Sequence, residues 1–146
     1  MKIIKGNLLK EAKNGKFNYI IHGCNCLHIM GAGIAKQIRA QFPDAYIADK
    51  LTKKGDKHKL GTYSISNTEK FGIINGYTQF GIGKGSIDYS ALQQLFANIK
   101  KDFGNKNHTF GIPKIGAGLA GGDWKIIKKI IEKEMYDEEV ILVIYQ

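Results

Sequence analysis

The sequence predicts an α/β domain with three layers, in which helices cover both faces of a central sheet. Strand-like and helix-like segments alternate along the whole chain, which is the order that this class requires. The last strand segment is almost continuously apolar over residues 140–144, as in strands that are covered on both faces. With 146 residues, 43% of them hydrophobic, the chain is long enough for one core, so residues 1–146 are expected to form a single domain.

Six segments are predicted as strands because they are short, apolar or alternating, and bounded by glycine or polar residues. They span residues 2–5, 19–24, 61–66, 71–78, 109–115 and 139–146. In open sheets of this class, ligands bind beyond the carboxyl ends of the strands. The loops that follow these strands are therefore the places to look for a functional site.

Four helices are predicted between the strands from apolar side chains at helical spacing. They span residues 33–42, 44–53, 88–103 and 124–135. The first ends at Pro43, which cannot continue a helix, and the third ends before Gly104, a residue typical of helix C-termini. The apolar faces consist of Ile34, Ile38, Phe42, Leu92, Leu95, Phe96, Ile99, Phe103, Ile127, Ile130 and Ile131.

Lysine and arginine outnumber aspartate and glutamate by 22 to 13, which gives a net charge of +9. Such an excess favours an anionic partner, namely a nucleic acid, a nucleotide or another phosphorylated ligand. The lysine pairs at 53–54, 100–101 and 128–129 are scattered and are not interleaved with aromatic residues, which argues against a nucleic-acid-binding surface. A small phosphorylated molecule is therefore the expected partner.

The only cysteines, Cys24 and Cys26, are one residue apart and are not expected to bond to each other. This cysteine usage indicates a reducing, cytoplasmic setting. No apolar stretch reaches the roughly 20 residues of a membrane span, and the N-terminus lacks the long apolar run of a signal peptide. We therefore expect no membrane partner, and we expect a monomer.

Glycine is unusually frequent, with 18 residues, and it clusters at two strand-to-helix junctions, residues 31–33 and 116–122. Such junctions expose backbone N–H groups, and the missing side chains let a phosphate approach them closely. We expect the two junctions to hold the two phosphates of one dinucleotide-like ligand, although glycines also serve simply to make tight turns. The expected contacts are Gly31, Ala32, Gly33, Ile34, Ile115, Gly116, Ala117, Gly118, Leu119, Ala120 and Gly121.

Two nucleotide-binding motifs are approximated but not met. Residues 116–121 have the glycine spacing of the dinucleotide-binding fingerprint, but no acidic residue stands at the end of the next strand to hold a ribose. Residues 81–85 resemble a phosphate-binding P-loop, but Gly85 stands where a serine or threonine is required. We interpret residues 81–85 as a flexible turn that can act as a lid over the ligand.

Four potential metal ligands, His22, Cys24, Cys26 and His28, alternate along one segment. Alternate side chains of a strand lie about 6.6 Å apart, whereas zinc–ligand bonds measure about 2.0–2.3 Å. One ion would require the chain to coil tightly, so we expect no metal. Cys24 is interpreted as a small packing residue, with a nucleophile as the alternative.

Three polar residues near the glycine clusters are the candidate catalytic residues. His22 ends an apolar run just before the first cluster, and we expect it to face the ligand and exchange protons; the alternative is a hydrogen-bonded core histidine. Asn25 can donate to a ribose hydroxyl or serve as a turn residue. Asp123 precedes a predicted helix, where it can act as N-cap or on the distal end of a ligand.

Four short motifs occur in a recognisable order along the chain. They are KGNLL at residues 5–9, IHGCN at 21–25, GAGIA at 31–35 and IPKIGAG at 112–118. Together they resemble the macro domain, an ADP-ribose-binding family, over nearly the whole chain. The resemblance implies a mixed, mostly parallel central sheet of six strands, with ADP-ribose or its 1″-phosphate as the ligand and no cofactor. It also implies ligand contacts from Asn7 and Leu8.

The stretches HGCNC at residues 22–26 and IGAGLAGGDW at 115–124 are most similar to the ADP-ribose 1″-phosphate phosphatases of yeast and phage. In that branch the histidine that matches His22 is tied to activity. The resemblance therefore implies hydrolysis of the terminal phosphate of ADP-ribose 1″-phosphate. A non-catalytic ADP-ribose reader, and a hydrolase that removes ADP-ribose from macromolecules, are the alternatives.

The chain departs from related proteins at three positions. Gln79 and Ala120 stand where the family's ADP-ribosyl-glutamate hydrolase has its lysine and aspartate, which argues against that mechanism. Asn7 replaces the acidic residue with which the family binds adenine. An amide oxygen can still accept a hydrogen bond, but without charge assistance, so we expect weaker selection for adenine.

Overall fold

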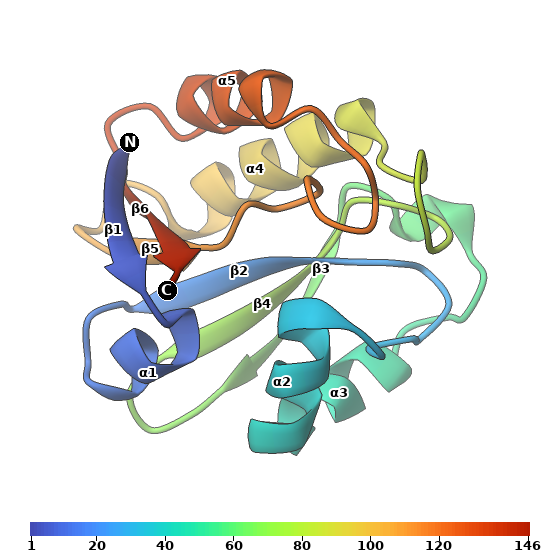
Figure 1. Cartoon of the computed structure of the whole chain (residues 1–146), viewed down its shortest axis with the longest axis horizontal. Coiled ribbons are helices and arrows are strands. Elements are labelled where there is room, and N and C mark those ends of the chain that lie inside the picture. Colours follow the sequence, from blue (N-terminus) through green and yellow to red (C-terminus); the bar gives the residue numbers. More distant parts are fainter.

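The computed structural model describes all residues from Met1 to Gln146 and contains one six-stranded sheet between two helical layers (Figure 1). The strands are β1 (Lys2–Gly6), β2 (Tyr19–Cys24), β3 (Tyr63–Asn67), β4 (Gly72–Tyr77), β5 (Thr109–Ile112) and β6 (Glu139–Tyr145). Their order is β1-β6-β5-β2-β4-β3, and all neighbours are parallel except β3, which is antiparallel to β4. The mixed, mostly parallel sheet predicted from the sequence is confirmed.

Helices cover both faces of this sheet (Figure 1). The first layer consists of α1 (Leu8–Lys13), α2 (Gly33–Gln41) and α3 (Pro43–Lys50), and the second of α4 (Tyr89–Phe103) and α5 (Trp124–Glu134). Successive strand residues point to opposite layers: Ile20 belongs to the core under the first layer and Ile21 to the core under the second. The buried strands are therefore apolar on both faces.

The structure differs from the predicted elements in a few places. Helix α1 was not predicted, because its six residues are too few to show a helical period. The fifth strand ends at Ile112 rather than residue 115, because Pro113 has no N–H to continue the ladder. Helix α3 begins at Pro43, since proline suits the first position of a helix as well as the position after one.

Two strands form the edges of the sheet, β1 on one side and β3 on the other. β1 is largely exposed, and both of its lysines, Lys2 and Lys5, are on the surface. The neighbouring β6 lies between β1 and β5, so both chain termini are on this side of the sheet, at opposite ends of two parallel strands (Figure 1).

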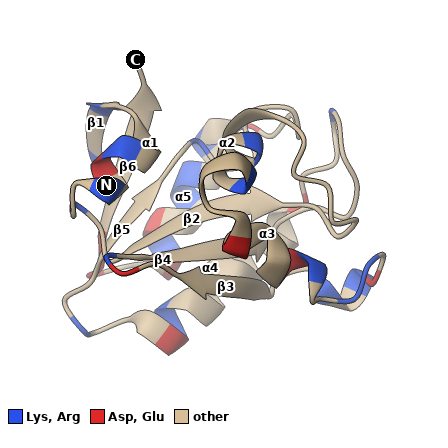
Figure 2. Ribbon diagram, turned by 90° about the horizontal axis from the view of Figure 1, so that it is seen from below, with Lys and Arg blue, Asp and Glu red and all other residues tan.

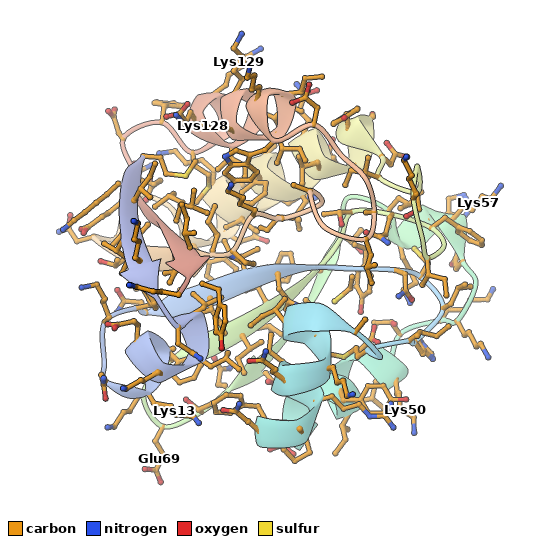
Figure 3. All side chains as sticks on the ribbon, viewed as in Figure 1. Lys13, Lys50, Lys57, Glu69, Lys128 and Lys129 are labelled. Carbon is orange, nitrogen blue, oxygen red and sulfur yellow. The ribbon has the colours of Figure 1, made fainter.

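Lysine and arginine residues are spread over both helical layers and the connecting loops (Figure 2). Lys128 and Lys129 project from the outer face of α5, whereas Lys13, Lys50 and Lys57 lie on other sides of the molecule (Figure 3). The positive charge therefore surrounds the molecule rather than forming one stripe.

No helix of the structure combines the length and the apolar character that crossing a membrane requires.

Candidate functional site

The parallel strands β2 and β5 end at the same edge of the sheet, and the segments that follow them enclose a cavity of about 280 Å³. A third wall comes from the segment after β4, which is the other neighbour of β2. The lining residues are Gly23, Cys24, Asn25, Ile29, Gly31, Ala32, Gly33, Ile34, Ala35, Gln79, Ile82, Gly83, Pro113, Lys114, Ile115, Gly116, Gly118, Leu119 and Ala120. Both predicted glycine junctions thus meet at one site.

The structure places most of the predicted ligand contacts in this lining, but not all of them. Those that line the cavity are Gly31, Ala32, Gly33, Ile34, Ile115, Gly116, Gly118, Leu119 and Ala120. Ala117 and Gly121 belong to the second junction but do not line it. Asn7 caps α1, its Oδ1 accepting from the Lys10 N–H at 3.0 Å, and Leu8 is buried in the core. Asn7 and Leu8 thus lie outside this lining, and a contact between them and a ligand that extends beyond the cavity stays a prediction.

Some glycines of the junctions are required by backbone conformation. Gly33, Gly116 and Gly121 have φ angles of 57°, 74° and 76°, the left-handed region that favours glycine. Gly118 has no such angle, and a Cβ built on it would meet no atom within 4 Å. Neither conformation nor packing explains glycine at position 118. A closely approaching ligand does explain it, because Gly118 lines the cavity.

The segment from Gln79 to Ile87 is anchored to the second junction. The Ala120 carbonyl accepts hydrogen bonds from the N–H groups of Gly85, at 2.9 Å, and Ile87, at 3.4 Å. The Gln79 amide Nε2 donates to the Gly81 carbonyl at 2.9 Å. The predicted flexible turn is therefore tied at both ends, and it forms a wall of the cavity through Gln79, Ile82 and Gly83.

The Asn25 side chain holds the loop that leads into the first junction. Its Oδ1 accepts from the N–H groups of Leu27, at 2.9 Å, and Ile29, at 3.3 Å, and its Nδ2 donates to the Ile29 carbonyl at 2.7 Å. The turn role expected for Asn25 is thus present. Since the amide nitrogen carries two protons, these contacts leave one N–H to donate to a ligand at the cavity wall.

The expectation that His22 faces the ligand is wrong. Its side chain is completely buried, does not line the cavity, and points with Ile20 towards the α1–α3 layer. Its Nε2 lies 2.7 Å from Oδ1 of Asn75. The Asn75 Nδ2 donates to the Ala45 carbonyl at 2.9 Å and to Ser64 Oγ at 3.0 Å, so Oδ1 is the acceptor and His22 Nε2 the donor. The core-histidine interpretation is confirmed.

Cys24 connects this buried histidine with the cavity, because its side chain contacts His22 and lines the site. The Cys24 sulfur is 3.8 Å from Nδ1 and 3.7 Å from Nε2, so it is aligned with neither nitrogen in particular. Burial, together with the charge of Asp49, raises the pKa of the Cys24 thiol well above its usual range. A protonated thiol is a poor nucleophile, which favours the packing role for Cys24.

Asp123 and Cys26 both make hydrogen bonds within the protein. Asp123 is exposed and caps α5, its Oδ1 accepting from the Lys125 N–H at 2.9 Å, so the N-cap role is confirmed. Asp123 does not line the cavity, and its action on the distal end of a ligand stays a prediction. Cys26 donates to the Gln79 carbonyl, and no group of three His, Cys, Asp or Glu side chains gathers in a way that can hold a metal ion.

Several lining residues did not stand out in the sequence. Ile29, Ile82 and Leu119 line the cavity with exposed apolar side chains, and Lys114 is the one charged residue in the lining. Gln79, named in the sequence only for the lysine it replaces, lies just after β4, a position that the rule on strand carboxyl ends would have selected. With one lysine and no carboxylate, the walls favour an anionic ligand that also has apolar faces.

The buried His22 predicts a pH dependence of stability. Burial lowers the pKa of His22 below its ordinary value of 6.5 in the folded protein, against the opposing effect of the Asn75 hydrogen bond. As the pH falls below about 6.5, the unfolded chain binds a proton that folded His22 does not, so the free energy of unfolding decreases by up to about 1.4 kcal/mol per pH unit. Urea titrations of wild type and His22→Gln should show this loss in the wild type only. Equal slopes for the two proteins would contradict it.

With this geometry in view, the chain can be placed in a family. The macro domain family model matches residues 10–131, and the chain belongs to the macro domain family. A relative described as an uncharacterized 17.5 kDa protein in the tk-vs intergenic region of Enterobacteria phage T4 is 39% identical, over 98% of this chain and 95% of its own. An ADP-ribose 1″-phosphate phosphatase of the yeast Scheffersomyces stipitis is 28% identical, over 95% of this chain and 96% of its own.

Solved structures share the fold. A protein of unknown function from Bacteroides thetaiotaomicron superposes with a TM-score of 0.82 at 27% identity, covering 99% of this chain and 97% of that one. The Thermosipho africanus DarTG in complex with ADP-ribose gives a TM-score of 0.78 at 15% identity, covering 99% of this chain and 42% of that one. At that identity the second likeness concerns the fold alone.

Proposed function

We propose that the protein binds ADP-ribose 1″-phosphate through its diphosphate and hydrolyses the terminal phosphate. The observation that carries this proposal is the meeting of two glycine junctions at one cavity, with Gly118 left open where no structural requirement calls for glycine. The yeast relative that bears the phosphatase name supports the choice of substrate. The +9 charge of the chain favours so anionic a ligand.

The arrangement of the strands suggests how such a ligand would lie. The cavity lies at the ends of β2 and β5. On the side towards β6 and β1, Tyr145 stands at the end of β6 with 77% of its surface exposed. An exposed aromatic ring is suited to stack on a nucleobase. On the other side are the polar side chains of Asn25 and Gln79. We therefore orient the base towards Tyr145 and the phosphorylated ribose towards Gln79.

The reaction requires little covalent help from the protein. A water oxygen attacks the terminal phosphorus, the bond from phosphorus to the ribose oxygen breaks, and a proton of the water passes to that ribose oxygen. The products are ADP-ribose and inorganic phosphate. Transfer of a phosphoryl group depends mainly on positioning and on stabilising charge. Backbone N–H groups of the two junctions would hold the diphosphate, and the free N–H of Asn25 would orient the ribose. His22 would act at a distance, as a positioning residue that supports Cys24 in the cavity floor.

Two measurements on the purified protein test this function. Calorimetry with ADP-ribose should show binding, and incubation with ADP-ribose 1″-phosphate should release inorganic phosphate. The proposal would be overturned if the protein neither bound ADP-ribose nor released phosphate. Full phosphatase turnover in a folded His22→Ala variant would show that His22 has no part in the reaction.

A second candidate is a non-catalytic reader of ADP-ribose. The observation that favours it is the absence of any carboxylate or imidazole among the lining side chains, so that no ordinary general acid or base faces the cavity. The same pair of measurements separates the two functions. Binding of ADP-ribose without release of phosphate supports the reader and overturns the phosphatase.

A further inference from the structure

We propose that Lys84 binds the terminal phosphate and so makes the protein prefer phosphorylated over unphosphorylated ADP-ribose. This inference rests on the proposed function and deepens it by assigning the residue that selects the substrate. Lys84 does not itself line the cavity as it stands, but it lies between Gly83, which does, and Gly85, which is bonded to the second junction.

The position of Lys84 is fixed by its backbone and its side-chain stem. Gly83 and Gly85 have φ angles of 96° and 82°, a backbone conformation that favours glycine on both sides of Lys84. A Cβ on Gly121 would lie 3.0 Å from Lys84 Cγ and 3.4 Å from Lys84 Cα. The stem of Lys84 therefore packs against Gly121 of the second glycine junction, next to Ala120, which lines the cavity.

The ammonium group of Lys84 has no partner in the protein. It takes part in none of the salt bridges or hydrogen bonds of the structure. Asp88 and Asp123 follow the two loops near Lys84, and both are used as helix caps. Asp88 caps α4 by accepting from the Ala91 N–H, and Asp123 caps α5 by accepting from the Lys125 N–H, each at 2.9 Å. The ammonium group of Lys84 is thus free to pair with an anion.

The sheet order places this charge at the correct end of the ligand. The segment that contains Lys84 follows β4, which lies on the far side of β2 from β5, β6 and β1. It therefore closes the end of the cavity opposite to Tyr145, where the phosphorylated ribose is oriented. A phosphate monoester carries a charge of about −1.5 to −2 at neutral pH, and the unphosphorylated ribose carries none, so a flexible ammonium distinguishes the two.

Binding of two ligands to three variants tests this assignment. The ligands are ADP-ribose and its non-hydrolysable 1″-methylenephosphonate analogue, which avoids turnover in the calorimeter. Wild type should prefer the phosphonate by about 10-fold or more, as expected for a hydrogen-bonded charge pair. Lys84→Met should reduce this preference to within about two-fold while leaving the affinity for ADP-ribose unchanged, and Lys84→Arg should retain most of it. Lys129→Met, which removes the same charge from the outer face of α5, should behave as wild type (Figure 3).

The outcomes separate the two proposals. If wild type binds ADP-ribose but shows no preference for the phosphonate, or if Lys84→Met keeps that preference, the role of Lys84 is overturned and ADP-ribose binding stands. If Lys84→Met weakens both ligands equally, the lysine contacts the diphosphate or the loop rather than the terminal group. If wild type binds neither ligand, the proposed function fails and the role of Lys84 fails with it.

Discussion

Gly118→Ala is expected to lower the affinity for ADP-ribose by about 10- to 100-fold while the protein stays folded. A methyl group at this position would occupy space at the cavity wall that the ligand needs, and forcing an extra carbon into a filled site costs about 1–3 kcal/mol. The free energy of unfolding should stay equal or rise by up to about 1 kcal/mol, because alanine restricts the unfolded chain and meets no atom within 4 Å in the folded one. Calorimetry and urea denaturation measure the two effects.

Gly81→Ala provides the matched control. Gly81 also lacks a left-handed φ angle, and a Cβ on it would likewise meet no atom within 4 Å, but it does not line the cavity. This variant should therefore bind ADP-ribose as wild type does. Wild-type affinity in Gly118→Ala would mean that no ligand approaches the second junction closely, and the binding mode proposed above would be wrong.

Asn75→Leu is expected to lower the free energy of unfolding by about 2–4 kcal/mol. The substitution leaves the Nε2–H of the fully buried His22 without an acceptor and removes the donors to the Ala45 carbonyl and Ser64 Oγ. Each buried polar group left unpaired costs about 1–3 kcal/mol. Urea denaturation at pH 7.5, above the pH range in which His22 affects stability, measures this loss without a contribution from histidine protonation.

The double variant His22→Leu, Asn75→Leu tests whether the loss comes from the unpaired partner. Replacing both members of a buried pair by apolar residues removes the unsatisfied group, so the double variant should be less destabilised than the sum of the two single variants. Additive losses would show that His22 and Asn75 contribute independently, and the hydrogen bond between them would then have little value for folding.

Much of the fold could be predicted because its determinants are local. Apolar runs, helical spacing and the positions of proline and glycine indicate five of the strands within about two residues of their bounds in the structure. The fifth strand is shorter, because Pro113 interrupts a ladder that hydrophobicity alone would extend. The short helix α1 was not predicted, because it is stabilised by the burial of Leu8, Leu9 and Ala12 and is too short to show a helical period in its apolar residues.

The cavity was also predictable, since glycine junctions after parallel strands must meet at the same edge of the sheet. The direction of His22 was not. Strand alternation puts His22 on the same side as Ile20, but it does not tell which layer covers that side. The covering residues come from α3 and β4, where Ala45 and Asn75 complete the burial of the ring. Those contacts join residues far apart in the sequence, so no local sequence pattern predicts them.

The exposed edge strand β1 has a consequence for the behaviour of the protein at high concentration. An unpaired edge invites a strand from another molecule, which is a common start of aggregation. Lys2 and Lys5 place two positive charges along this edge, and a second copy docking there would bring its own lysines against them. We therefore expect mutual repulsion to oppose the pairing of two β1 edges.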